Sequence, residues 1–110
     1  MVHELQSKEL NSYNEEIKEG LLLVDAFASW CGPCKMLAPV LENVAEEVTE
    51  VKFIKFSVET HKELATSLGI KSIPTLILYN DGVELDRVSG YMPKKQITEW
   101  INTNVSKRGQ

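Results

Sequence analysis

The sequence predicts an α/β fold in which helices cover both faces of one mixed β-sheet. Two observations favour it. Apolar strand-like runs alternate with amphipathic helix-like segments, and a tight turn joins the last two runs. Helical crossovers connect parallel strands, whereas a tight turn makes an antiparallel pair. With 110 residues and 43% apolar content, the chain is expected to form a single domain over residues 1–110.

Five segments are expected to be strands: residues 2–5, 21–28, 51–58, 75–79 and 83–89. The second and third are apolar on both faces, as strands in the middle of a parallel sheet should be. The turn Asn80-Asp81-Gly82 predicts a hairpin between the last two.

The first two expected helices flank the second strand. Ser7 is the expected N-cap of a helix that closes at Gly20 and has Leu10, Tyr13 and Ile17 on one face. The longer helix after residue 31 should bury a stripe made of Leu37, Val40, Leu41, Val44, Ala45 and Val48. Pro39 lies inside this helix and should kink it, because proline removes a backbone donor.

Two shorter helical segments complete the pattern. Thr60 and Glu63 have the spacing of a capping box, and Gly69 should end the helix that follows them. Pro93 lies near the start of a final helix, which should bury Ile97, Trp100 and Ile101.

The two cysteines of the chain lie two residues apart, in Trp30-Cys31-Gly32-Pro33-Cys34-Lys35. A strand ends and a helix begins here, so Cys31 should meet the electropositive helix N-terminus and ionise more readily. Gly32 and Pro33 allow the chain to turn into the helix. Cys34, one turn further on, could attack a mixed disulfide on Cys31 and release the product. The motif predicts a catalytic dithiol.

Half of a zinc site is the alternative interpretation of this spacing. Zinc normally needs four ligands, and the other soft candidates are His3 and His61, neither of which has a partner at ligand spacing. A structural staple is disfavoured too. Closing so short a loop restrains the unfolded chain by only about 2 kcal/mol. We therefore expect no metal and no cofactor.

Asp25 and Lys55 place charges within expected central strands. Burial among apolar neighbours would raise the pKa of Asp25 and let it exchange a proton with Cys34. The alternative is an edge position at which Asp25 points into water. Lys55 lies on the strand expected to pair with that of Asp25, where its charge would lower the pKa of Asp25. Alternatively, Lys55 simply extends to the surface.

Composition excludes other classes of function. The net charge is −4, without a basic block beyond Lys107-Arg108, so nucleic-acid binding has little electrostatic support. The longest apolar stretch is too short to span a membrane, and residues 1–10 lack a signal-peptide core. We expect a cytoplasmic protein, in which a catalytic disulfide is more usual than a structural one.

These features together resemble the thioredoxin family. WCGPCK follows the strand with Asp25, Pro39 lies in the next helix, and Ile73-Pro74-Thr75 precedes the Asp81-Gly82 hairpin, all in family order. The resemblance covers residues 2–105. It implies the thioredoxin fold and a protein disulfide reductase that a thioredoxin reductase re-reduces, most simply as a monomer.

The resemblance also implies individual roles. Cys31 would be the exposed attacking cysteine and Cys34 the buried resolving one, with Asp25 as the acid–base residue and Lys55 as its ion partner. Pro74 would be a cis-proline facing the disulfide, although X-Pro bonds are seldom cis. Substrates would dock on the residues around the disulfide, namely Trp30, Gly32, Pro33, Ile73, Pro74 and Gly90. The backbone of Ile73 would pair with an extended substrate segment.

Four positions depart from the family pattern. Phe27 replaces a common tryptophan, and Ser57 replaces a frequent aspartate. Ser89 and Tyr91 stand where smaller apolar residues are usual, so partner preference is open. None of the four removes a group expected to be catalytic.

Two other functions fit the same fold. Oxidases and isomerases share it, although isomerases commonly have Gly-His between the cysteines where this chain has Gly32-Pro33. A folding clamp or assembly subunit could use the docking surface without redox chemistry, because fold alone does not fix function.

Overall fold

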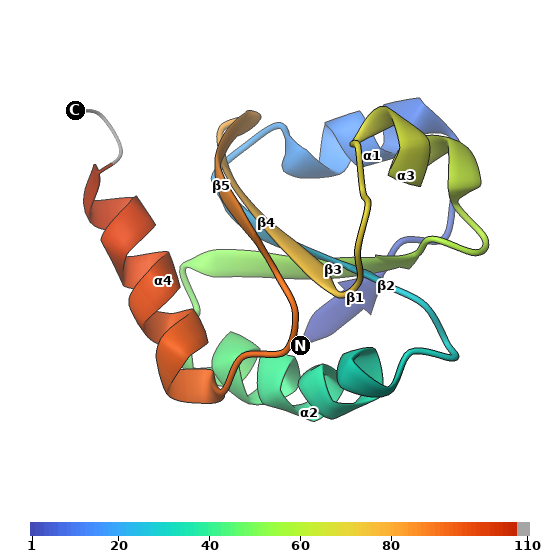
Figure 1. The fold of residues 1–110 in the computed structure, drawn as a ribbon. Coiled ribbons are helices and arrows are strands. Elements are labelled where there is room, and N and C mark those ends of the chain that lie inside the picture. The colour runs from blue at the N-terminus through green and yellow to red at the C-terminus, as the bar shows by residue number, and fades with distance from the viewer. Residues whose placement is uncertain (108–110) are drawn as a thin grey trace.

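In the computed structural model, which describes residues 1–107, five strands form one mixed sheet in the order β1-β3-β2-β4-β5 (Figure 1). The strands are β1 (Val2–Glu4), β2 (Leu21–Phe27), β3 (Val51–Ser57), β4 (Thr75–Asn80) and β5 (Val83–Ser89). β3 pairs in parallel with both β1 and β2, whereas β4 runs antiparallel to β2 and β5. The predicted fold class is confirmed, with strand ends shifted by at most one residue.

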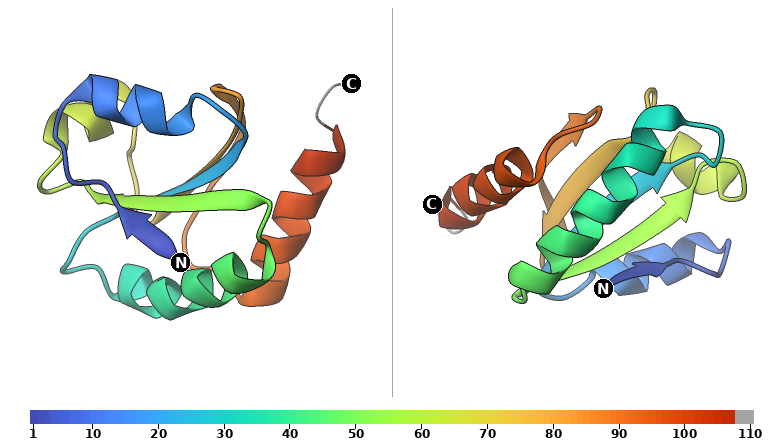
Figure 2. Two further views of the ribbon diagram at one scale, coloured as in Figure 1. Left: turned by 180° about the vertical axis from the view of Figure 1, so that it is seen from behind. Right: turned by 90° about the horizontal axis from the view of Figure 1, so that it is seen from below.

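Four helices cover this sheet: α1 (Leu10–Ile17), α2 (Gly32–Glu47), α3 (Lys62–Ser67) and α4 (Lys94–Lys107). α1 and α3 lie on one face and α2 on the other, with α4 next to β5 (Figures 1 and 2). The hairpin between β4 and β5 turns at Asp81 and Gly82, which have φ angles of 49° and 83°. These positive values explain the Asp-Gly pair.

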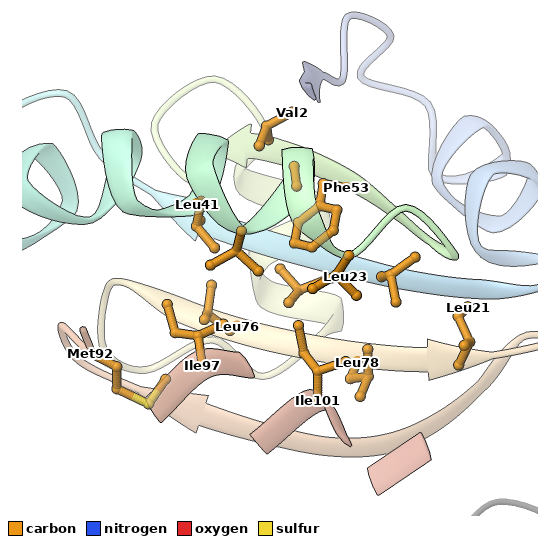
Figure 3. Packing of buried hydrophobic residues seen from close by; sticks show 14 of the residues in the cluster. Val2, Leu21, Leu23, Leu41, Phe53, Leu76, Leu78, Met92, Ile97 and Ile101 are labelled. Carbon is orange, nitrogen blue, oxygen red and sulfur yellow. The ribbon is translucent and has the colours of Figure 1, made fainter. Parts of the chain in front are cut away.

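Each face of the sheet has its own apolar core. On the α2 and α4 face, Leu23 and Phe53 pack against Leu41, Ile97 and Ile101 (Figure 3). Ile97 and Ile101 are fully buried and Trp100 packs beside them, which confirms the predicted face of the last helix. On the α1 and α3 face, the core includes Tyr13 and Tyr79, whose hydroxyls are 2.7 Å apart.

Two predicted helix caps are wrong. Glu9 is the N-cap of α1, while Ser7 Oγ accepts a 3.2 Å hydrogen bond from the Glu9 backbone N–H and so shapes the preceding turn. His61 is the N-cap of α3. The Thr60 hydroxyl instead lies 2.9 Å from His61 Nδ1, so it is not available to cap the helix.

Candidate active site

The cysteine pair lies at the junction between β2 and α2, where the sequence places it. α2 begins at Gly32 with Cys31 as its N-cap, and Pro33 stands in the first turn. Cys31 is extended, with φ −84° and ψ 113°, whereas Gly32 is already helical. Cys31 and Cys34 form a disulfide with 5.2 Å between their Cα atoms. The structure therefore represents the oxidised form.

The start of α2 offers one hydrogen-bond donor to the sulfur of Cys31 and one to its carbonyl oxygen. The Cys34 backbone N–H donates to Cys31 Sγ over 3.2 Å, and the Lys35 N–H donates to the Cys31 carbonyl over 3.1 Å. In the reduced protein, the Cys34 N–H and the positive end of the helix dipole would stabilise a negative charge on Cys31 Sγ. This geometry favours Cys31 as the more acidic thiol.

The surface exposure of the two cysteines differs from the expectation. We expected Cys31 at the surface and Cys34 deeper, but each is only 4% exposed in the disulfide. Their neighbours distinguish them instead. Cys31 Sγ lies 3.9 Å from the carbonyl oxygen of Ile73, whereas Cys34 borders a cavity that leads to Asp25. Trp30, one residue earlier, is the exposed group, at 69%.

Asp25 occupies the middle of the sheet and is 3% exposed, so the edge position considered above is wrong. Its Oδ1 is buried without a hydrogen-bond partner among residues 1–107. Burial is the larger cause that raises the pKa of Asp25 to about 7, and the charge of Lys55 opposes it. A carboxyl group with this pKa can exchange protons near neutrality.

Lys55 is the register partner of Asp25 on the adjacent parallel strand. Its ammonium lies 5.7 Å from the centre of the Phe27 ring, at the distance of a cation–π contact. Lys55 thus acts on Asp25 through its charge while its end group rests over an aromatic face. Phe27 supplies that face in place of the tryptophan that is common in the family.

A cavity of about 140 Å³ is bordered by both Asp25 and Cys34. Its lining comes from β2, β3 and the first turns of α2, and consists of Asp25, Phe27, Ala28, Ser29, Cys34, Lys35, Ala38 and Lys55. Cys34 and Asp25 therefore share one small space, which has room for the water molecules that could carry a proton.

The Ile73-Pro74 peptide bond is cis, as the resemblance implied. Ile73 is half-buried and packs against the cysteines, while Pro74 is buried rather than exposed. The Gly90 N–H donates to the Pro74 carbonyl over 2.8 Å, and Gly90 has a φ of 94°. Five of the six predicted docking residues are exposed or half-buried, with Pro74 as the exception.

Sequence reasoning missed Glu59 and Ser29. Glu59 Oε1 accepts hydrogen bonds from both the backbone N–H and the hydroxyl of Ser29, each over 2.8 Å. Each residue stands two positions past the end of one of two paired parallel strands, Ser29 after β2 and Glu59 after β3. The carboxyl ends of parallel strands meet at one edge of the sheet, and that spacing was the available signal.

In the described part of the chain, no helix is both long and apolar enough to cross a membrane. Within residues 1–107, no three side chains of His, Cys, Asp or Glu are grouped as a metal site would require. His61, one of the zinc candidates, has Nε2 3.1 Å from the Ser7 carbonyl.

A disulfide at a helix N-terminus, beside a cis-proline and above a buried carboxyl group, defines a class of proteins, the thiol–disulfide oxidoreductases. The comparisons with known proteins agree. The thioredoxin family model matches residues 2–103. The chain is 48% identical over 91 residues to a thioredoxin of Chlamydia caviae, which covers 83% of this chain and 89% of the relative.

Other relatives extend the likeness. A thioredoxin of Bacillus subtilis is 40% identical over 95 residues, which is 86% of this chain and 91% of the relative. The solution structure of the oxidised thioredoxin from Plasmodium falciparum superimposes with a TM-score of 0.82 at 30% identity and covers 94% of this chain and 97% of its own. The chain belongs to the thioredoxin family. It is a thiol–disulfide oxidoreductase that acts through the Cys31–Cys34 pair.

Proposed function

We propose that Cys31 attacks the disulfide of a protein substrate, Cys34 resolves the mixed disulfide, and Asp25 accepts the proton of Cys34. The observation that supports this division is the different surroundings of the two sulfur atoms. Cys31 Sγ accepts a hydrogen bond from the Cys34 N–H at the start of α2, whereas Cys34 shares a cavity with Asp25.

The reaction balances as two sulfur exchanges. The Cys31 thiolate forms a bond to one substrate sulfur, and the substrate disulfide breaks to release a thiolate. Cys34 then loses its proton to Asp25 and attacks Cys31 Sγ, which forms the Cys31–Cys34 disulfide and releases the second substrate sulfur as a thiolate. The substrate gains two electrons and the protein dithiol loses them.

An external dithiol must restore the reduced form, because the product is the disulfide seen in the structure. A thioredoxin reductase is the proposed donor, by analogy with the family. We propose that the protein works as a monomer in the cytoplasm. Its substrates would dock around Trp30, Gly32, Pro33, Ile73 and Gly90, with Pro74 supporting this surface from below.

Cys31→Ser and Cys34→Ser test the two sulfur roles separately. With dithiothreitol as donor and a disulfide-bonded protein as substrate, Cys31→Ser should abolish turnover. Cys34→Ser should also stop turnover but accumulate a mixed disulfide on Cys31, detectable by mass spectrometry without reductant. Retention of near wild-type turnover by Cys31→Ser, or a mixed disulfide trapped on Cys34, would contradict the assignment.

A further inference from the structure

Glu59 connects the turn after β3 to the loop that leads into Cys31. We propose that Glu59 is a positioning residue for disulfide exchange, and that it acts through Ser29 on the segment carrying Trp30 and Cys31. This inference rests on the proposed function and concerns a residue that does not touch the reacting sulfur atoms.

The contact between Glu59 and Ser29 constrains the loop in two ways. One carboxylate oxygen, Oε1, accepts a 2.8 Å hydrogen bond from the Ser29 backbone N–H and another of 2.8 Å from the Ser29 hydroxyl. The first bond orients the peptide plane between Ala28 and Ser29, and the second holds the Ser29 side chain in one rotamer. Ser29 is followed directly by Trp30 and Cys31, so its orientation sets where that segment leaves the sheet.

Glu59 is itself held from the side of β3. Its backbone N–H donates to Ser57 Oγ over 3.1 Å. The Val58 N–H donates to the carbonyl of Phe27, the last residue of β2, over 2.8 Å, which continues the pairing of the two strands beyond the end of β3. A fixed turn therefore presents the carboxylate to Ser29. Ser57, one of the departures from the family pattern, acquires a structural role in this arrangement.

The Glu59 side chain is a charged carboxylate at neutral pH. Hydrogen bonds from the Ser29 backbone and then the Ser29 hydroxyl lower the pKa of Glu59 below its ordinary 4.5. Charge-assisted hydrogen bonds are shorter and more directional than neutral ones. Because Glu59 lies at the surface, its contribution to folding is small, and its role is to orient the loop.

Ser29 also borders the cavity shared by Asp25 and Cys34. A shift of the Ser29 backbone would therefore change both the approach of substrate to Cys31 and the space through which Cys34 loses its proton. The reacting groups need near-attack geometry, so even a small displacement lowers the rate.

The test uses Glu59→Ala, Glu59→Gln, Ser29→Ala and the double variant Glu59→Ala/Ser29→Ala in a Trp100→Phe background. Trp30 is then the sole tryptophan, because the chain has two. The measurements are kcat and KM for reduction of a disulfide-bonded protein, acrylamide quenching of Trp30 and the melting temperature. Glu50→Ala, an exposed glutamate in the turn between α2 and β3, is the matched control.

We expect Glu59→Ala to lower kcat/KM by about three- to tenfold, below the ~100-fold cost of a full 1 Å displacement. Trp30 quenching should rise, while the melting temperature changes little. Glu59→Gln retains an acceptor oxygen and should recover most of the rate. Ser29→Ala should lose part of the rate but add nothing in the Glu59→Ala background, because its partner is already gone. Glu50→Ala should match the background.

Unchanged kcat/KM and quenching in Glu59→Ala would overturn the proposal, as would additive effects of Glu59→Ala and Ser29→Ala. If Glu59→Ala proved unfolded, kcat/KM and Trp30 quenching in Glu59→Gln and Ser29→Ala would test the proposal instead. Cys31→Ser, assayed in parallel, separates the two ideas. Turnover by Cys31→Ser would contradict the proposed function, whereas an inactive Cys31→Ser beside a normal Glu59→Ala would contradict only this inference.

Discussion

Two carboxyl groups, those of Asp25 and Glu59, lie near the segment before Cys31, and their surroundings shift their pKa values in opposite directions. Asp25 is 3% exposed, and its Oδ1 lacks a hydrogen-bond partner in the part of the chain that the structure describes. Glu59 is at the surface and accepts two hydrogen bonds from Ser29. The pKa of Asp25 is raised to about 7 by burial, whereas that of Glu59 is lowered by its bonds.

Because their pKa values differ, the two carboxyl groups are suited to different roles. A carboxyl that titrates near neutrality can take up and release a proton during a reaction. A carboxylate that stays charged can only attract and orient donors. Asp25, which shares a cavity with Cys34, is therefore suited to proton transfer. Glu59 is suited to fixing the orientation of Ser29.

Replacing the buried Asp25 with asparagine should have the largest effect, both on the unfolding free energy and on turnover. Asp25 binds a proton in the folded state up to pH about 7, whereas in the unfolded chain it ionises near 3.8. Its contribution to stability is thus fully present below 3.8 and is lost as the pH rises through 7. Between pH 4 and 8, the wild-type chain should lose about 4 kcal/mol of unfolding free energy relative to Asp25→Asn.

Urea unfolding of both proteins across this pH range measures the difference. Glu50→Gln is the control and should follow the wild-type curve. Turnover of a protein disulfide by Asp25→Asn should fall by about 100-fold at pH 7, the lower end of the range for a lost general base. Parallel stability curves for Asp25→Asn and wild type would show that Asp25 does not titrate near 7.

Lys55→Met should have an intermediate effect on turnover, and it tests whether the charge of Lys55 acts on Asp25. The charge of Lys55 lowers the pKa of Asp25, so its removal should move the pH midpoint of the turnover profile above 7. Turnover at pH 7 should fall by about two- to threefold, since less Asp25 is ionised. Methionine retains the apolar stem that packs near Phe27. A pH–rate profile decides, and a midpoint shifted downward would contradict the coupling.

Glu59→Gln should have the smallest effect on stability, and its direction is opposite to that of Asp25. A lowered pKa stabilises the folded state above the ordinary value of 4.5, and this contribution is lost as the pH falls through the folded pKa. Glu59→Gln should therefore be slightly less stable than wild type above pH 4.5, and the two stability curves should converge as the pH falls through the folded pKa. A difference that appeared only above pH 6 would show that Glu59 does not titrate in this way.

The sequence alone predicted the sheet and its helices well, because apolar runs, glycine turns and amphipathic stripes are local signals. Cys31, Cys34 and Asp25 also stood out, since each is chemically unusual in its segment. The pattern could suggest that Asp25 is buried but could not exclude an edge position. Only the pairing of β2 with both β3 and β4 decides that point.

Contacts between distant segments could not be predicted in the same way. The bond between Ser29 and Glu59 spans thirty residues, and each residue alone looks like an ordinary surface group. The failed caps have a related cause. Ser7 and Thr60 carry the right side chains for capping, but their hydroxyls are engaged by Glu9 and His61. The local sequence indicates which side chains could cap a helix, but competing hydrogen-bond partners in the folded structure decide whether they do.

Both edge strands of the sheet carry features that disfavour pairing between copies of the chain. β1 has only three residues, and the outer strand β5 carries Glu84, Asp86 and Arg87 along its length. Short or charged edge strands resist strand-to-strand association between copies. The irregular backbone just before β4, where Lys71 and Ser72 are exposed, belongs to neither edge strand. The substrate docking proposed at Ile73 would therefore use the irregular backbone between α3 and β4 rather than either edge strand.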